Sequence, residues 1–147
     1  MHTYSSVIHI YSSVIHIKTT GSLDIINISP HIEDFVARHT VLTGFLILFI
    51  AGSTAALTTI EYEQGAVEDL KQAIERIAPQ DLPYEHDRRW GDGNGYAHVR
   101  AALLGPSLTI PLQEGRIQLG TWQQIVLCDF DNRPRQREVI VQLHGDA

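Results

Sequence analysis

The fold of this chain depends most on a segment that begins H-D-R-R-W-G-D-G-N-G-Y-A-H, at residues 86–98. It continues as S-L-T-I-P at residues 107–111 and as G-R-I-Q-L-G-T-W-Q-Q at residues 115–124. The first part predicts a turn-rich loop that leads into a short apolar helix, and the later parts predict β structure punctuated by glycine. Side chains that can bind metal ions or protons are concentrated where the backbone turns, between rigid elements. Functional sites are often built in this way, so we expect the site here.

Upstream of this segment, the apolar pattern predicts four strands and two helices. The clearest element is a helix over residues 66–78, because its apolar residues form one stripe at helical spacing and Pro79 ends it. The other upstream elements are strands over residues 11–17, 23–28, 45–51 and 55–63, and a helix from Ser29 and Pro30 to about His39.

The remaining elements lie in the central segment and in the C-terminal part. We expect a loop over residues 80–95, a helix over residues 97–104, and strands over residues 108–112, 116–130 and 138–144. The predicted order is ββαββααβββ, with three helices. This order is typical of an α+β fold with an antiparallel sheet.

Two identical copies of Y-S-S-V-I-H-I occupy residues 4–10 and 11–17. Each copy alternates like a strand, but a length of seven residues is odd, so in one continuous strand the two copies would present opposite faces. We expect the second copy to form the first strand of the fold. Residues 1–10 are then a duplicated N-terminal extension that is bulged, frayed or paired with a neighbouring subunit. His9 and His16 are expected at the sheet edge rather than as repeated metal ligands.

Length and composition limit the possible functions. With 147 residues, of which 44% are hydrophobic and 19% charged, the chain is long enough for a single domain with its own core. The formal net charge of −6 gives no electrostatic case for nucleic-acid binding, and the apolar run at residues 45–51 is too short to span a membrane. Cys128 is the single cysteine, so no internal disulfide framework is expected. We therefore expect a cytoplasmic protein without nucleic-acid or membrane partners.

Four motifs resemble the YjbQ/UPF0047 family. They are H-D…N-x-x-A-H at residues 86–98, G-x-S-x-T-I-P at residues 105–111, G-x-x-x-L-G-T-W-Q-x-I at residues 115–125 and D-x-R-x-R at residues 131–135. The resemblance covers residues 11–143, and the pair T-I-P and L-G-T-W-Q is highly specific. It implies a bent antiparallel sheet, or half-barrel, with helices on one side, and assembly as a homotrimer.

The resemblance also implies a function. Family members are associated with a low thiamine-phosphate-synthase activity, which joins a pyrimidine pyrophosphate to a thiazole phosphate. We therefore expect a small-molecule enzyme that binds a small anionic or phosphorylated ligand, is weak in that reaction and has an unknown true substrate. Two alternatives stay open. One is a non-catalytic homotrimer that binds a metal or an anion, and the other is a structural assembly in which the histidines are hydrogen-bonded core residues.

His86 and His98 are the candidate metal ligands, because neutral imidazole is the commonest protein ligand for metal ions. A catalytic zinc needs about three protein ligands. Asp87, Asp92, Glu61 or a group from a neighbouring subunit could supply the third ligand to zinc, magnesium or manganese. The alternative is that His98 is a core residue at a helix start and His86 a hydrogen-bonding loop residue.

Glu61, His86, Asp87 and His98 are the candidate catalytic residues. Glu61 alternates with small and apolar residues on its predicted strand and matches a glutamate of the family. It is a candidate general acid or base, whose pKa burial would raise, or else a salt-bridged strand residue. Asp87 would orient His86 or hold a metal-bound water. The resemblance implies a pocket where His86, His98 and Glu61 converge, within one chain or between subunits.

Residues 52–54 supply two candidate ligand-binding residues, Ser53 and Thr54. Many family members have His-Ser/Thr-Thr-Ala where this chain begins with Gly52, and G-H-A-H where this chain has Tyr96. The resemblance implies that the histidine matching Gly52 lines the family's pocket, so its absence here counts against a metal site of the family type. The turn could instead offer backbone N–H groups and hydroxyls to an anion such as phosphate, although turns of small residues are common without any ligand.

Asn94 and Trp122 complete the ligand-binding candidates. Asn94 is expected to fix the loop before the helix, by capping or by a positive φ. Trp122 is expected in the core more than as a platform for a ligand. The run at residues 131–137 is a predicted hairpin connection with three arginines. A solvated turn or an intersubunit ion-pair strip is favoured there over phosphate recognition.

Overall fold

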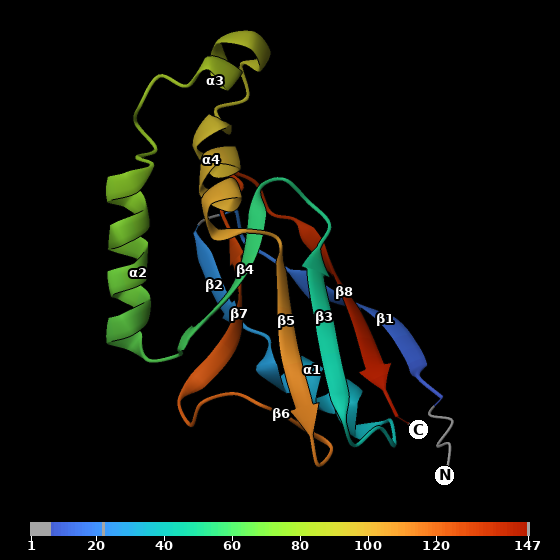
Figure 1. The fold of residues 1–147 in the computed structure, drawn as a ribbon. Helices are drawn as coiled ribbons and strands as arrows, with labels where there is room; N and C mark the ends of the chain where they lie inside the picture. The colour runs from blue at the N-terminus through green and yellow to red at the C-terminus, as the bar shows by residue number, and fades with distance from the viewer. Residues whose placement is uncertain (1–6, 22, 147) are drawn as a thin grey trace, which may run out of the picture.

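Two antiparallel sheets form the framework of the protein in a computed structural model that describes residues 7–21 and 23–146 (Figure 1). The first sheet has five strands in the order β1-β8-β3-β5-β6, and the second has three in the order β2-β7-β4. The strands are β1 (His9–Lys18), β2 (Asp24–Asn27), β3 (Gly44–Ile50), β4 (Ala55–Glu61), β5 (Ser107–Gln113), β6 (Arg116–Ile117), β7 (Gln123–Asp129) and β8 (Gln136–Gly145).

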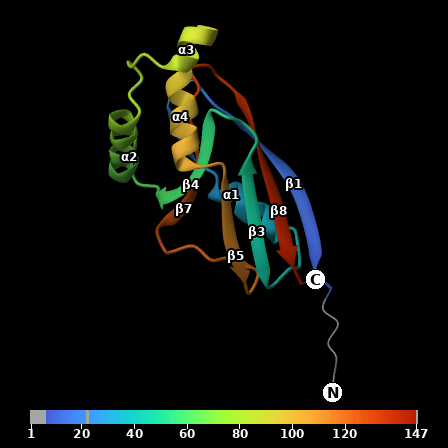
Figure 2. The same cartoon turned by 45° about the horizontal axis from the view of Figure 1, so that its top comes forward.

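Helices pack on and between these sheets. Those of the described residues are α1 (Ser29–Ala37), α2 (Gln64–Ile77), α3 (Glu85–Trp90) and α4 (Gly95–Leu104). α2 and α4 contact β4 of the three-stranded sheet, whereas α1 contacts β6 and β7. Figures 1 and 2 show α3 and α4 at the end of the molecule away from the termini, with α1 among the strands. In the described chain, no helix combines the length and the apolar character that a membrane span requires.

The three-stranded sheet is a middle layer with a hydrophobic core on each of its faces. In β7, Ile125 and Leu127 belong to the core between the two sheets, whereas Val126 and Cys128 belong to the core under α2 and α4. Side chains alternate along a strand, so a strand that is covered on both faces must be apolar at successive positions. This requirement explains the unbroken apolar run in β7.

The core between the sheets contains most of the fully buried side chains. Burying one leucine or isoleucine stabilises the fold by about 1.5–3 kcal/mol, so this group holds the two sheets and α1 together. Its leucine and isoleucine members with almost no exposed surface are Ile28, Ile32, Leu46, Leu48, Ile50, Leu57, Leu112, Ile125, Leu127 and Leu143.

The N-terminal repeat enters the five-stranded sheet as one continuous strand. β1 pairs with β8 without interruption from His9 to Lys18. Ile17 is 6% exposed, whereas its counterpart in the first copy, Ile10, is 60% exposed, as the odd repeat length requires. His9 and Ile10, the last residues of the first copy, are therefore regular strand residues rather than a bulge. Residues 4–6 of the first copy lie outside the described residues.

The predicted α+β class and curled antiparallel arrangement are confirmed, but two predicted elements differ. The observed order is ββαββαααββββ. The expected loop over residues 80–95 contains α3, which ends at Gly91 with a left-handed φ of 66°. The expected strand over residues 116–130 is interrupted between β6 and β7. Trp122 lies in that interruption and is 72% exposed, so the prediction that it is a core residue was wrong.

Candidate functional site

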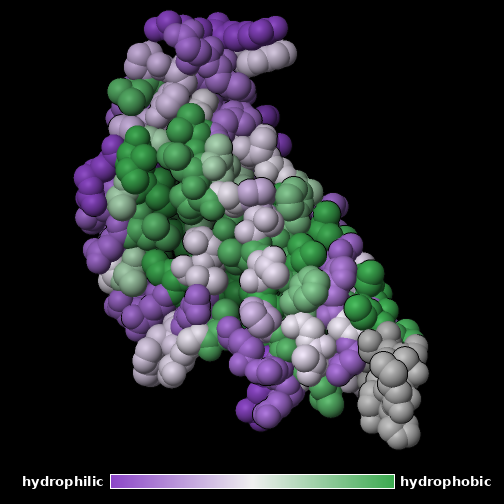
Figure 3. All heavy atoms as spheres, viewed as in Figure 1, coloured by the Kyte–Doolittle hydropathy of each residue, from purple (hydrophilic) through white to green (hydrophobic). Residues whose placement is uncertain are grey.

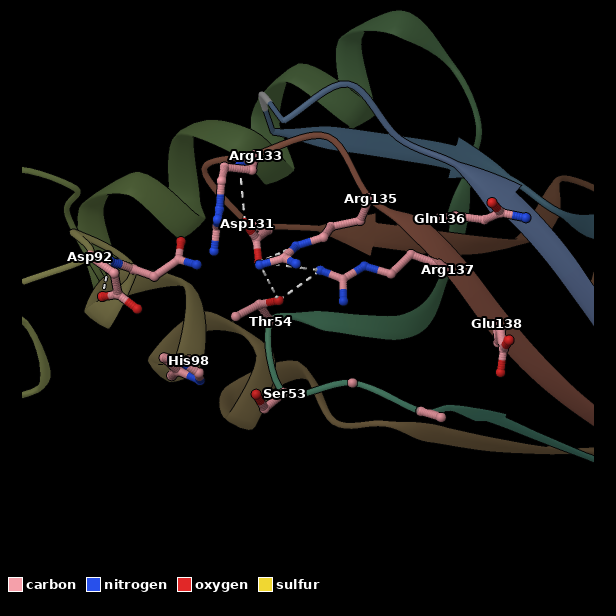
Figure 4. Close-up of a pocket in the computed structure, with 13 residues that line it drawn as sticks. Ser53, Thr54, Asp92, His98, Asp131, Arg133, Arg135, Gln136, Arg137 and Glu138 are labelled. Atoms are coloured by element: carbon pink, nitrogen blue, oxygen red, sulfur yellow. Dashed lines mark hydrogen bonds and ion pairs between the residues drawn. The ribbon is translucent and has the colours of Figure 1, made fainter. Parts of the chain in front are cut away.

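A polar pocket of about 470 Å³ opens at the end of the three-stranded sheet where β4 begins and β7 ends (Figure 4). Three segments line it. They are the β3–β4 turn at residues 51–54, the first turn of α4 with the loop before it, and the β7–β8 connection with the start of β8, which together carry three arginines. Because these segments converge from distant parts of the chain and bring mostly polar groups, this pocket is the candidate site.

Arg137 and Asp129 form the buried centre of the pocket wall. Arg137 Nε donates to Asp129 Oδ2 at 2.7 Å and Nη2 donates to Asp129 Oδ1 at 2.8 Å, which makes a bidentate pair. Nη2 also donates to Thr54 Oγ1 at 2.7 Å, and the Thr54 hydroxyl donates to Asp131 Oδ2 at 2.9 Å. All four residues are buried, so the network holds the guanidinium in one orientation.

Asp131 remains ionised in this network. Burial raises the pKa of its carboxyl. Hydrogen bonds from the Thr54 and Asn94 side chains, from the backbone N–H of Arg133 and from Arg135 lower the pKa by more, so it lies below the ordinary value for aspartate. The Asp131 carboxylate is therefore a fixed negative charge at neutral pH.

Asn94 connects the β7–β8 loop to the start of α4. Its side-chain Oδ1 accepts a hydrogen bond from Asn132 N at 3.0 Å, and Asn132 Nδ2 donates to the backbone oxygen of Asp92 at 2.8 Å. Asn94 is the N-cap residue of α4 with a φ of −102°, but its side chain makes no capping hydrogen bond. The expected side-chain cap or positive φ is therefore wrong. Asn94 instead fixes two walls of the pocket against each other.

His86 in α3 and His98 in the first turn of α4 lie side by side, with ring centroids 4.4 Å apart. Asp87 helps to hold the two helices together, because its Oδ1 accepts a hydrogen bond from Gly95 N at 2.8 Å. Gly95 permits the close approach, since a Cβ at this position would lie 2.5 Å from the Cβ of Tyr84. His98 lines the pocket, so the histidine pair meets the pocket at its rim.

The His86 Nδ1 atom is shielded from solvent and makes no hydrogen bond among the described residues. It lies 3.3 Å from Asp92 Oδ1 and 3.6 Å from Asp87 Oδ1. Ligands of a tetrahedral ion at about 2.1 Å lie roughly 3.4 Å from each other, so these separations fit a divalent cation. His86, Asp87 and Asp92 could therefore hold a metal ion, with ligand atoms within 4.8 Å of one another. His98 lies beside this set rather than within it.

Glu61 and Trp122 lie at the opposite end of the three-stranded sheet. Glu61 is the last residue of β4 and Ala55 is the first, which separates them by roughly 20 Å along the strand. Glu61 and Trp122 line a different pocket, of about 520 Å³, and both are exposed. Within one chain Glu61 therefore does not converge with His86 and His98. It is itself exposed, although Ala55 and Leu57 on the same strand face are buried.

The two hydroxyl residues of the β3–β4 turn have different surroundings. Thr54 is buried and bonded to Arg137 and Asp131, so its hydroxyl is already occupied. Ser53 is exposed and lines the pocket, where Figure 4 shows it below the arginines. Of these two predicted ligand-binding residues, Ser53 is the one that presents its hydroxyl to the pocket.

Sequence reasoning missed the role of Arg137. It is not part of a solvated turn, because its side chain is only 9% exposed and is paired with Asp129. The sequence does carry a signal: Asp129 and Asp131 lie at the end of an apolar strand and close in sequence to Arg135 and Arg137. Buried charges need partners, so carboxylates and arginines next to a buried strand indicate an internal ion-pair network.

The family assignment comes from relatives that match along most of the chain. The family profile described as "UPF0047 protein YjbQ-like" matches residues 13–146. A UPF0047 protein of Archaeoglobus fulgidus is 38% identical over 125 residues, which cover 85% of this chain and 94% of the relative. The UPF0047 protein YugU of Bacillus subtilis is 32% identical over 129 residues, which cover 87% of this chain and 95% of the relative.

Solved structures agree with these relatives. A YbjQ-like protein of unknown function from Sulfolobus solfataricus has a TM-score of 0.90 at 28% identity, covering 95% of this chain and 100% of that chain. An uncharacterized protein of the yjbq/upf0047 family from Clostridium acetobutylicum has a TM-score of 0.81 at 30% identity, covering 89% of this chain and 98% of that chain. Sequence and fold thus agree, and the chain belongs to the YjbQ/UPF0047 family.

Proposed function

We propose that this protein is a small-molecule enzyme that acts on a phosphorylated substrate and has a weak activity of the thiamine-phosphate-synthase type. The position of His98 supports this proposal most, because the residue lies against His86 and also lines the arginine-containing pocket. A group that can transfer protons is thereby placed beside groups that can bind negative charge. Both assist the release of pyrophosphate, because negative charge develops on the leaving oxygens.

The residues would divide the work of such a reaction. His86, Asp87 and Asp92 would hold a divalent ion, which would supply positive charge against a departing pyrophosphate. His98 would donate a proton from a ring nitrogen to an oxygen of the departing pyrophosphate. The arginines of the β7–β8 connection orient the anionic part of the substrate.

A non-catalytic protein that binds a metal or an anion is the second candidate. The separation between Glu61 and the histidines favours it, because a single chain then lacks the carboxylate expected as general acid or base. In that case the pocket binds its ligand and releases it unchanged. Binding without turnover therefore distinguishes the two candidates.

We also propose that the protein works in the cytoplasm as a homotrimer. The outer face of the five-stranded sheet supports self-association, because Ile10, Val14, Phe45 and Phe49 are each at least 40% exposed there. Figure 3 shows hydrophobic side chains spread among polar ones over this side of the molecule. Light scattering should give three times the chain mass, and a smaller mass for Phe45→Glu with Phe49→Glu. A monomer mass for the unmodified protein would contradict the trimer.

Metal content is the first test of the enzymatic proposal. We expect elemental analysis of untagged protein to find a divalent metal that is lost in His86→Ala, because this variant removes the shielded Nδ1 ligand. His31→Ala is a matched control, since His31 is exposed on α1. An unmodified protein without metal, even after incubation with zinc or manganese, would contradict the metal site.

Turnover is the second test. The protein is incubated with the pyrimidine pyrophosphate and the thiazole phosphate, and the released pyrophosphate is measured with the joined product. We expect turnover in the unmodified protein and in His31→Ala, and its loss in His98→Ala. Turnover that survives unchanged in His98→Ala would remove the proposal.

A further inference from the structure

Arg137 keeps one guanidinium nitrogen that bonds to no protein group. Its Nε and Nη2 atoms are bonded to Asp129 and Thr54, whereas Nη1 makes no hydrogen bond within residues 7–21 and 23–146. The side chain as a whole is 9% exposed, so Nη1 is the unpaired part of a nearly buried charge. In Figure 4 one nitrogen of Arg137 points away from Thr54, toward the turn that carries Ser53. A donor held in this way is available to a ligand.

Gly52 leaves open the space in front of this nitrogen. A Cβ at residue 52 would lie 2.9 Å from Arg137 Nη1, closer than side-chain atoms normally approach. Gly52 is not among the glycines with a positive φ, so its backbone conformation does not require glycine. What a side chain at this position would remove is the space beside the guanidinium.

Two further arginines line the same pocket. Arg135 uses Nε to pair with Asp131 at 3.1 Å, which leaves its two terminal nitrogens for a ligand. Arg133 makes no ion pair within the described ranges, and Figure 4 shows its side chain entering the cavity between Asp92 and Asp131. Asp92 and Glu138 lie on opposite sides of the arginine group in Figure 4. The middle of the pocket is therefore the part with most positive charge.

The donors in this middle part fit a tetrahedral oxyanion. Three arginines surround two buried carboxylates, Asp129 and Asp131, which already accept several hydrogen bonds each. Arginine binds phosphate through several N–H groups at once, and a guanidinium already fixed by a carboxylate loses little conformational entropy on binding. Ser53 adds an exposed hydroxyl at the edge of the same space.

We propose that Arg137 Nη1, the terminal nitrogens of Arg133 and Arg135, and the Ser53 hydroxyl form a subsite for the phosphoryl group of a phosphate monoester or a pyrophosphate. This inference rests on the proposed function and specifies the chemical group by which the substrate is held. The histidine pair lies beside the subsite, so a bound phosphoryl group reaches the edge where His98 lies.

Calorimetric titration of metal-free protein with inorganic phosphate and with pyrophosphate tests the subsite. We expect one of these anions to bind, and the tighter one shows whether the subsite takes one phosphoryl group or two. Gly52→Ala places a methyl group against Nη1 and should weaken binding roughly 10-fold, or about 1.4 kcal/mol, and Arg133→Gln should act in the same direction. Gly120→Ala is the matched control, because a Cβ there meets nothing closer than 3.5 Å.

Two results would overturn the subsite: no binding of either anion, or equal affinity in the unmodified protein, Gly52→Ala and Arg133→Gln. Ser53→Ala, at an exposed position, provides a third variant if Gly52→Ala fails to fold, and thermal unfolding shows whether it does. His98→Ala separates this inference from the enzymatic proposal. It should abolish turnover and leave anion binding intact, so each proposal can fail without the other.

Discussion

The two ends of the three-stranded sheet carry pockets of similar size but different construction. At the arginine end, Arg137, Asp129 and Thr54 are buried and bonded to one another. At the tryptophan end, Glu61 and Trp122 are exposed. Both pockets are lined by polar side chains, yet only the first holds its charges in fixed positions before a ligand arrives. Binding and catalysis depend on such preorganisation, so the arginine end is the better candidate.

The surroundings of the two ends explain this difference. At the arginine end, α4 and the β7–β8 connection enclose the charges and are joined through Asn94. At the tryptophan end, the side chains bond at exposed or partly buried positions, such as Gln123 Nε2 to Thr59 Oγ1 at 2.9 Å and Tyr62 OH to the backbone oxygen of Ile25 at 3.0 Å. Water screens exposed charges there, and their pairing contributes little to stability.

Removal of the buried ion pair should give the largest contrast between the ends. Arg137→Ala leaves Asp129 buried without its partner, so we expect the free energy of unfolding to fall by about 3–5 kcal/mol. Glu61→Ala removes an exposed carboxylate, and the change should stay within about 0.5 kcal/mol. Urea denaturation measures both variants. Equal losses would show that the arginine end is no better ordered than the tryptophan end.

Gly95→Ala should separate the histidines while leaving the arginines in place. The added Cβ would lie 2.5 Å from the Cβ of Tyr84, so α3 and α4 must move apart. This movement should lower the free energy of unfolding by about 1–3 kcal/mol. We expect weaker metal retention by elemental analysis, because His86 moves with α3. Gly120→Ala, whose added Cβ would meet Gln123 only at ordinary contact distances of 3.5 Å or more, is again the control. Unchanged metal content in Gly95→Ala would mean that α3 can adjust without losing its ligands.

Lowering the pH should reduce the free energy of unfolding, because Asp131 at the arginine end becomes protonated. The pKa of its carboxyl is lower in the folded state than the unfolded value of about 3.9, so the unfolded chain takes up this proton first as the pH falls. The stabilisation is complete above about pH 4 and disappears as the pH falls through the folded-state pKa. Urea denaturation between about pH 6 and pH 3 should show this decline, and Asp131→Asn should flatten it. Asp81→Asn, at an exposed position, should keep the slope of the unmodified protein.

Trp122→Ala should have the smallest effect. The side chain is 72% exposed, so we expect the free energy of unfolding to change by about 0.5 kcal/mol or less, and phosphate binding to stay unchanged. Calorimetric titration measures the binding. Weaker binding in this variant would instead place the tryptophan of a neighbouring subunit at the arginine end, and the two ends would then form one composite site.

Most of the fold could be predicted because hydrophobic periodicity is a local property. The stripe of α2 and the apolar run of β7 depend only on neighbouring residues. α2 lies within two residues of its predicted bounds, and β7 forms the C-terminal part of the strand predicted over residues 116–130. α3 could not be predicted in this way, because it has only six residues, too few to show a helical period. It lies in the segment between Pro83 and Gly91. A helix this short is stabilised by its contacts with α4 rather than by its own sequence.

The candidate site was less predictable because it depends on which strand ends meet. His86 and His98 are close in sequence, so their proximity could be inferred from the loop between them. Glu61 and Arg137 could not be placed, since the strand order decides which pocket each one reaches. Local pattern gives the face of a strand on which a residue lies, but not the neighbours at its ends.

The Arg137–Asp129 pair also connects the two sheets, since Arg137 lies on β8 and Asp129 on β7. Within the described chain, no ion pair joins the sheets at the tryptophan end. Transient separation of the sheets should therefore begin at the tryptophan end and stop at the arginine end. Amide hydrogen exchange in β7 should then be faster near Gln123 than near Cys128, and the gradient should disappear in Arg137→Ala.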